Sequence, residues 1–228
     1  MECFDYIKSN YLALTEEIAL LSEKAGRKVT LVAVTKSGSD DELVALMASG
    51  ASDIGENRPG ELRRRGDLLK EKGYDPTLHE IGNLQRNKVK LIIESVALIH
   101  SLDSDALASE ISRQAVKVGR TVRVLIEINS GREAQKGGIM PEDAESFLLR
   151  IRELPGIEVS GLMTMGPVCD CAEDMRPYFR ETKALYDSLN EKYGFKDGVL
   201  SMGMSDSYAV AIEEGATLVR VGRKLFCK

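Results

Sequence analysis

Short apolar runs alternate with longer amphipathic stretches from residue 29 to the end of the chain, and this alternation restricts the fold most. Most of the short runs are rich in β-branched and aliphatic residues, as buried strands are. They cover residues 29–36, 52–57, 77–82, 97–104, 121–129, 157–165, 199–204 and 217–222. Parallel strands need a crossover between them, so eight runs separated by seven helical stretches predict a (β/α)8 TIM barrel. An open, doubly wound sheet is the main alternative.

The stretches between the runs have the spacing of helices that pack on a sheet. Leu43, Leu46 and Met47, for example, share one helical face. A further stretch at residues 2–25 predicts an extra helix before the first strand. Because no linker, low-complexity segment or residue-level repeat interrupts the pattern, we expect residues 1–228 to form a single α/β domain.

The composition argues against several classes of protein. Lys and Arg number 31 and Asp and Glu 36, and this mild acidity argues against a general nucleic-acid binder, which would show a basic face. No stretch reaches the roughly 18 apolar residues that cross a membrane, and the N-terminus does not resemble a secretory signal. The four cysteines lack metal-site spacing and only two histidines accompany them, so we expect reduced thiols, no metal site and a cytoplasmic location.

Lys36 ends the first predicted strand, and active groups of β/α barrels sit at such strand ends. It shares one face of that strand with Val32 and Val34. In a semi-enclosed pocket there, desolvation would disfavour the ammonium form and free the amine to attack a carbonyl, which is Schiff-base chemistry. Taken alone, the strand is more typical of a lysine that extends from the barrel rim into water.

Arg220 is an always-charged residue within the short apolar run 217–222. A buried guanidinium needs a hydrogen-bond acceptor, which a protein carboxylate or a ligand can supply. The last strand of a closed barrel neighbours the first, so we expect Arg220 to lie near Lys36. Two cations in one pocket suit an anionic ligand, and a structural salt bridge of Arg220 is the alternative.

The loops after the last two predicted strands are candidates for binding a phosphate, as they are in many β/α barrels. One carries Ser205 and Asp206 at the start of a helix, and the other carries Gly222 and Arg223. Free backbone N–H groups and a serine hydroxyl would donate to the phosphate, and a glycine lets the backbone approach it. The alternative is that Ser205 or Asp206 caps the helix, and both roles can coexist.

Together these residues fit a ligand with an aldehyde, a pyridine nitrogen and a phosphate, which is pyridoxal 5′-phosphate (PLP). The aldehyde would join Lys36, and the ring nitrogen would face Arg220. Ser205 and the backbone amides of Gly222 and Arg223 would hold the phosphate.

Several segments along nearly the whole chain carry a more specific pattern: LVAVTK, DIGENR, HEIGNLQRNK, IHSLDS, GLMTMGP, LSMGMSDSY with AIEEGAT, and VRVGRKLF. In these segments the chain resembles the pyridoxal-phosphate homeostasis protein family, which is similar to the N-terminal barrel of alanine racemase. Two positions within HEIGNLQRNK depart from that pattern. Glu80 stands where an apolar residue is usual and Asn83 where histidine is frequent, and we expect neither to touch the cofactor.

The resemblance implies a fold type III PLP-binding barrel without the second β domain of the racemases. It implies that Lys36 forms the Schiff base and that Arg220 lies beside the pyridine nitrogen. The other implied contacts are Asn57 near the ring, Ser205, Gly222 and Arg223 at the phosphate, and Met165 and Met204 in the pocket lining.

Two classes of function can use such a site. Racemisation needs an acid–base group on each face of the substrate and an electron sink in the ring. Lys36 could serve one face, but the similar racemases draw the other base from a second domain, for which we see no room after Gly222. Tyr208 is the one weak candidate within the barrel. An arginine keeps its proton, so Arg220 would leave the ring nitrogen unprotonated and weaken the sink.

We therefore expect a monomer that binds PLP and takes part in PLP homeostasis without efficient catalysis. PLP-requiring apoenzymes are its candidate partners. A low-activity PLP-dependent amino-acid racemase is the alternative, and a barrel lyase that uses Lys36 on a sugar aldehyde is a third class.

Overall fold

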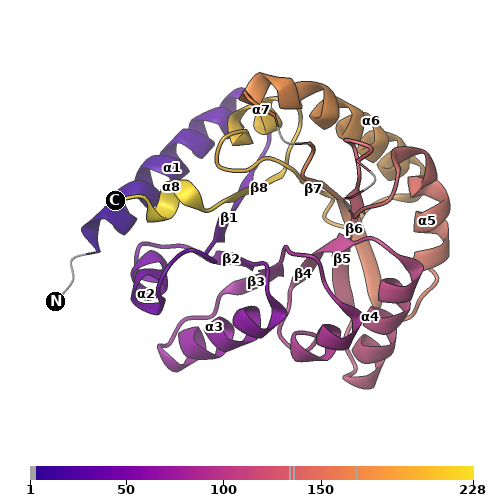
Figure 1. The fold of residues 1–228 in the computed structure, drawn as a ribbon, viewed down its shortest axis with the longest axis horizontal. Coiled ribbons are helices and arrows are strands. Elements are labelled where there is room, and N and C mark those ends of the chain that lie inside the picture. The colour runs from indigo at the N-terminus through magenta and orange to yellow at the C-terminus, as the bar shows by residue number, and fades with distance from the viewer. Residues whose placement is uncertain (1–3, 134, 136, 168) are drawn as a thin grey trace.

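Eight parallel strands form a closed barrel in chain order, from β1 to β8, in the computed structural model of the chain. The model describes residues 4–133, 135, 137–167 and 169–228. Figure 1 shows the strands at the centre and the helices around them. Strand β8 pairs with β1 in parallel, with Arg220 opposite Val32, and this pairing closes the barrel. The (β/α)8 prediction is confirmed, and the open sheet is wrong.

Each predicted run contains one strand. The strands are β1 (Thr30–Val34), β2 (Asp53–Glu56), β3 (Thr77–Glu80), β4 (Leu98–Leu102), β5 (Val122–Ile128), β6 (Ile157–Thr164), β7 (Val199–Ser201) and β8 (Leu218–Val221). Every strand ends before its predicted run does, so the chain leaves the barrel wall early. β7 ends at Ser201, shortly before Gly203, whose φ of 92° lies outside the range of a regular strand.

Helices cover the outside of the barrel. They are α1 (Asp5–Lys24), α2 (Asp40–Ala48), α3 (Pro59–Glu71), α4 (Asp105–Lys117), α5 (Ala144–Ile151), α6 (Arg176–Tyr193), α7 (Tyr208–Glu213) and α8 (Arg223–Phe226). The crossover from β3 to β4 contains only the 3₁₀ helix η1 (Arg86–Leu91). The extra N-terminal helix is confirmed as α1; the predicted positions 2 and 3 lie outside the described residues.

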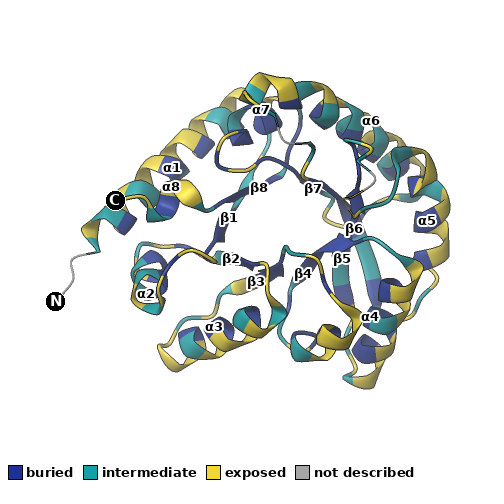
Figure 2. Ribbon diagram, viewed as in Figure 1, coloured by how far each residue is buried: buried dark blue, intermediate teal, exposed yellow. Residues whose placement is uncertain are grey.

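The core lies mainly between the barrel wall and the helices, where Figure 2 shows the buried faces of the helices turned toward the strands. On α2 the buried residues are Leu43, Leu46 and Met47, as the helical spacing predicts. A smaller apolar cluster fills part of the barrel interior, and its buried members are Val32, Leu98, Leu125, Met163 and Leu218. Within the described residues, no helix is both long and apolar enough to span a bilayer.

Candidate functional site

A pocket of about 640 Å³ opens at the mouth of the barrel, where the strands end. Its lining comes from the ends of β1, β2, β3, β5, β6, β7 and β8 and from the loops that follow them. The lining residues are Val34, Lys36, Ser37, Asn57, Ile81, Gly82, Asn83, Glu127, Gly137, Met165, Met204, Ser205, Asp206, Ser207, Arg220, Gly222 and Arg223. All eight site residues predicted from the sequence are among them.

Lys36 lies in the turn that follows β1, and its side chain is exposed. The sequence predicts a partly desolvated lysine at the strand end, but β1 stops at Val34, so Lys36 starts from the turn over the open mouth. Arg65 of α3 holds this turn from behind by donating to the carbonyls of Thr35, at 2.5 Å, and Gly38, at 2.6 Å. The backbone that carries Lys36 is therefore fixed, while its side chain lines the pocket.

Glu56, the last residue of β2, completes the support beneath Lys36. Its carboxylate accepts a 2.7 Å bond from Arg65 and a 2.5 Å bond from the Thr35 hydroxyl. Glu56 and Arg65 are both buried, at 1% and 6% exposure. Asn57, the next residue, turns into the pocket and packs its backbone against Gly82.

Arg220 is buried beneath the pocket at 4% exposure. Its guanidinium donates to the hydroxyl of Ser201 at 2.5 Å and to the backbone carbonyl of Thr164 at 3.0 Å, and both acceptors are neutral. Burial lowers the pKa of Arg220 to about 10, against the opposing charge of Glu127, so the group is still a cation at neutral pH. None of the described carboxylates forms an ion pair with Arg220, so the alternative of a structural salt bridge is wrong.

The two predicted phosphate loops lie against each other. The Ser205 hydroxyl accepts a 3.3 Å bond from the Gly222 amide, which brings the two predicted donors to one place. A Cβ on Gly222 would lie 2.9 Å from the Val34 carbonyl oxygen, so only glycine allows this close approach of β8 to β1. Helix α7 begins at Tyr208, three residues after Ser205, and neither Ser205 nor Asp206 caps it. Asp206 instead pairs with the side chain of Arg223.

Met165 and Met204 border the pocket, and each is 40% exposed. Exposed thioether side chains give a pocket rim an apolar and adaptable surface. Asn83 also lines the pocket, beside the predicted cofactor residues. The expectation that it does not touch the cofactor stays a prediction.

Glu127 is a pocket residue that the sequence analysis missed. It is 8% exposed, and burial, followed by the nearby charge of Asp103, raises its pKa to about 7 in spite of Arg220. A carboxyl group with such a pKa in a pocket can take up and release protons at neutral pH. The available signal was a glutamate inside the apolar run 121–129, where a charged residue is out of place.

Tyr208, the weak candidate for a second base, does not line the pocket. It is 2% exposed and receives a 2.8 Å hydrogen bond from Lys224 of α8. Burial, followed by the neighbouring Glu17, raises the pKa of its phenol. Tyr208 is therefore a packing residue between the barrel and α1.

Glu80, the other departure from the family pattern, is fully buried and lies outside the pocket lining. One carboxyl oxygen accepts a 3.1 Å bond from the Gly82 amide, and the other has no partner among the described residues. Burial raises the pKa of Glu80 to about 8, and the charge of Glu56 acts in the same direction.

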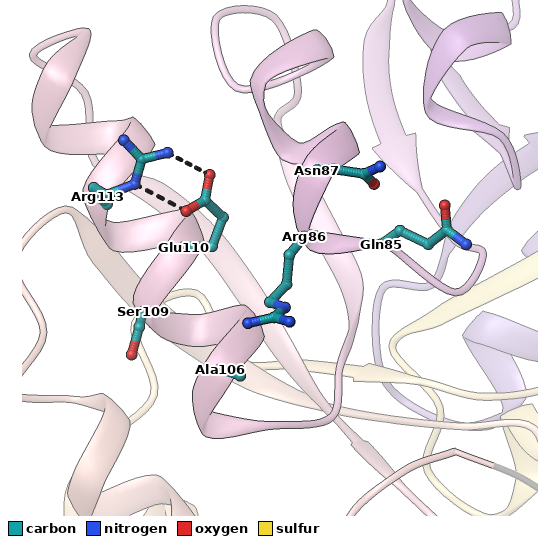
Figure 3. Close-up of a pocket in the computed structure, with 7 residues that line it drawn as sticks. All are labelled: Gln85, Arg86, Asn87, Ala106, Ser109, Glu110 and Arg113. Atoms are coloured by element: carbon teal, nitrogen blue, oxygen red, sulfur yellow. Dashed lines mark hydrogen bonds and ion pairs between the residues drawn. The ribbon is translucent and has the colours of Figure 1, made fainter.

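A second hollow of about 680 Å³ lies on the outer surface, between η1 and α4 (Figure 3). Its residues are Gln85, Arg86, Asn87, Ala106, Ser109, Glu110 and Arg113. Glu110 and Arg113 point toward each other there and form an ion pair at 2.7 Å. The hollow offers no amine beside a buried cation, so the barrel mouth is the better candidate site.

The chain matches the family described as alanine racemase, N-terminal domain, over residues 10–227. It is 42% identical over 214 residues to a pyridoxal phosphate homeostasis protein of Aquifex aeolicus, covering 92% of this chain and 93% of that one. A protein of the same name from Deinococcus radiodurans is 38% identical over 216 residues, covering 94% and 97%.

Solved structures show the same barrel. PipY of Synechococcus elongatus with PLP bound superimposes with a TM-score of 0.84 at 29% identity, covering 96% of this chain and 99% of that one. Alanine racemase of Clostridium difficile superimposes with a TM-score of 0.74 at 19% identity, covering 97% of this chain and 55% of the racemase, and it shares the fold alone. The chain therefore belongs to the pyridoxal phosphate homeostasis protein family, within the wider family of the alanine racemase N-terminal domain.

Proposed function

We propose that this protein binds PLP as a Schiff base on Lys36 and takes part in PLP homeostasis without efficient catalysis. The observation that carries the proposal is the shared pocket of Lys36, Arg220 and Ser205. Its three groups match the three polar parts of the cofactor, namely the aldehyde, the ring nitrogen and the phosphate. The names of the relatives and the PLP held by PipY support the same cofactor here.

Each group of the pocket suits the part of PLP that we assign to it. Lys36 has an exposed amine on a fixed turn, which a carbonyl carbon can reach. Arg220 keeps its charge, and the hydrogen bonds it forms to the described residues go to neutral acceptors, so it can still donate to a ring nitrogen. Ser205 and the amides of Gly222 and Arg223 would hold the phosphate, Asn57 would lie near the ring, and Met165 and Met204 would line the pocket.

The chemistry that PLP supplies when bound is the withdrawal of electrons from an attached amine. The protein's own residues limit that chemistry. Arg220 cannot give its proton to the ring nitrogen, because it stays a cation at neutral pH. Tyr208 lies outside the pocket, so it cannot act on the face opposite Lys36. We infer a carrier that acts as a cytoplasmic monomer and delivers PLP to apoenzymes.

One observation favours the alternative, a low-activity amino-acid racemase. Glu127 lines the pocket with a pKa of about 7, and it could serve as the second acid–base group. Deuterium exchange at the α-carbon of amino acids separates the two proposals. A carrier loaded with PLP exchanges no deuterium, whereas a racemase exchanges it and loses this exchange in Glu127→Gln.

The central claim is tested by the visible absorbance of the PLP-loaded protein before and after borohydride, followed by mass mapping of its peptides. We expect the band to disappear on reduction and the added mass of the cofactor to lie on the peptide with Lys36. Lys36→Ala should lose both signals, and Lys72→Ala, at the end of α3 and outside the pocket lining, should keep them. An absent band, or a label on another lysine, would overturn the proposal.

A further inference from the structure

A chain of hydrogen bonds crosses the inside of the barrel and ends at Arg220. Oδ1 of Asp53 lies 3.0 Å from Nε2 of His79, and Nδ1 of His79 lies 3.0 Å from Nε2 of His100. Nδ1 of His100 lies 3.0 Å from the Ser201 hydroxyl, which also accepts the 2.5 Å bond from Arg220. These five residues are called the interior relay below.

The interior relay connects the two ends of the barrel. Asp53 is the first residue of β2, and its side chain is 19% exposed, so water reaches this end. Ser201 is the last residue of β7 and is hydrogen-bonded to Arg220, which lines the candidate pocket. Strands β4 and β7 lie on different sides of the barrel (Figure 1), so the bond from His100 to Ser201 crosses the interior.

Only one arrangement of hydrogens satisfies every bond when His79 is neutral and Asp53 is ionised. Arg220 can only donate, so the Ser201 oxygen accepts from it and the Ser201 hydroxyl donates to Nδ1 of His100. His100 then carries its hydrogen on Nε2 and donates to His79, which donates in turn to Asp53. Burial, followed by the charges of His79 and Arg220, lowers the pKa of His100 well below its ordinary value, so this ring stays neutral.

We propose that the interior relay couples the protonation of His79 to the hydrogen bonding of Arg220 at the barrel mouth. A charged His79 donates from both nitrogens, so His100 must accept at Nε2 and carry its hydrogen on Nδ1 instead. One proton is added in all. It ends on Nδ1 of His79; the hydrogen of His100 moves from Nε2 to Nδ1, and Ser201 keeps its hydroxyl hydrogen, which turns away from His100.

The change at Ser201 reaches Arg220 directly. In the charged state, the Ser201 oxygen accepts from both His100 and Arg220, so its bond with Arg220 weakens. The N–H groups of the guanidinium are then held less strongly by Ser201 and are more available to an acceptor in the pocket. Arg220 therefore becomes a stronger donor to a ring nitrogen in the pocket when His79 is charged. This last step rests on the proposed binding of PLP.

The groups around His79 include one that a charged ring can pair with. Asp53 of β2 and His100 of β4 face its ring from opposite sides. Burial raises the pKa of Asp53, but the hydrogen bonds from His79 and Ser52 outweigh this effect and hold that pKa below its ordinary value. The charge of Lys28 also acts on Asp53, and the Asp53 charge acts on Tyr11. Asp53 is therefore an anion that a charged His79 can face.

The test reads the tautomers of the histidines in the unloaded protein by NMR of ¹⁵N-labelled histidine. The chain has only two histidines, so His79→Gln assigns both rings. We expect Nε2–H on both rings at pH 8, and at lower pH a doubly protonated His79 together with Nδ1–H on His100. The Arg220 side-chain signals should shift with the same midpoint. A His100 tautomer that does not change as His79 titrates overturns the proposal.

Two variants extend the test beyond a structural role. In Asp53→Asn the charged His79 loses its partner, so the signal of the doubly protonated ring at pH 6 should fall; Asp67→Asn on exposed α3 should not change it. With PLP loaded, the absorbance should change with pH together with the protonation of His79, and His79→Gln should lose this change. A His79→Gln protein whose absorbance changes with pH as the parent's does contradicts the proposal. If PLP does not bind, the proposed function fails while the histidine spectra still decide the relay.

Discussion

Two buried arginines of this barrel are bonded in opposite ways. Arg65 of α3 and Arg220 of β8 are 6% and 4% exposed. Arg65 forms a 2.7 Å ion pair with the Glu56 carboxylate and two bonds to carbonyls behind Lys36. Arg220 is bonded to one hydroxyl and one backbone carbonyl, and burial lowers its pKa to about 10.

We expect this difference to separate a structural cation from a cation that can bind a ligand. The charge of Arg65 is neutralised by Glu56 inside the protein, so little of it is felt at the pocket. The guanidinium of Arg220 is hydrogen-bonded to neutral acceptors, and Glu127 acts on it only through its charge, so we expect it to remain available to a ligand. A buried arginine is therefore a stronger sign of a ligand site when its partners are neutral than when a carboxylate pairs with it.

The largest effect on stability is expected for Arg65→Met. The variant leaves the Glu56 carboxylate buried without its cation, and breaking such a pair costs about 3–5 kcal/mol in the free energy of unfolding. Urea denaturation at pH 7 measures this loss. Arg64→Met is the matched control, because Arg64 pairs with Asp40 on the surface at 45% and 44% side-chain exposure, where pairs contribute about 1 kcal/mol or less.

The double variant with Glu56→Gln and Arg65→Met shows whether the stranded carboxylate is the cause. Removing the charge of Glu56 should recover part of the lost stability, because no anion then remains buried. A double variant as unstable as Arg65→Met alone would mean that the carbonyl bonds of Arg65, and not its ion pair, hold the Lys36 turn.

A smaller effect, of opposite sign, is expected for Glu80→Gln. Folded Glu80 keeps its proton up to a pKa of about 8, whereas the unfolded chain releases it near the ordinary pKa of 4.5. The folded state thus binds more protons between these values, so Glu80 lowers stability as the pH rises from about 4.5 to about 8.

Glu80→Gln removes this titration and keeps the carbonyl oxygen that accepts from Gly82. We expect the variant to be more stable than the parent by about 1–3 kcal/mol at pH 8 and equally stable at pH 4.5. Urea denaturation at both values checks it, and a gain of the same size at both would contradict the pKa as its cause.

The barrel and the position of its site could be predicted from the sequence, because both follow from local patterns. Each apolar run produced one strand, and the residues after the runs necessarily meet at one end of a parallel barrel. Lys36, Ser205 and Gly222 were found in this way, and the structure brings them to one pocket. Their contacts with PLP stay a prediction.

The bonds inside the barrel could not be predicted, because they join strands that are distant in sequence. His79 and His100 meet only because β3 and β4 pair with a particular register, and Ser201 reaches His100 across the interior. Sequence spacing also gave no reason to join Arg65 to Glu56. The partner of a buried charge depends on the direction of each side chain, and a pattern of apolar residues does not contain that direction.

The smallest effect on stability is expected for Arg220→Met, although the pocket should lose function. The variant strands no anion, because Glu127 has a pKa of about 7 and can take up a proton when the nearby cation is removed. Replacing a buried cation by an apolar side chain of similar volume should change the free energy of unfolding by about 1 kcal/mol or less. The affinity for PLP should fall at least about tenfold, since a hydrogen bond from a charged donor is lost. Urea denaturation and a PLP titration of the same sample measure both quantities. A loss of stability as large as that of Arg65→Met, with PLP binding unchanged, would reverse the roles of the two arginines.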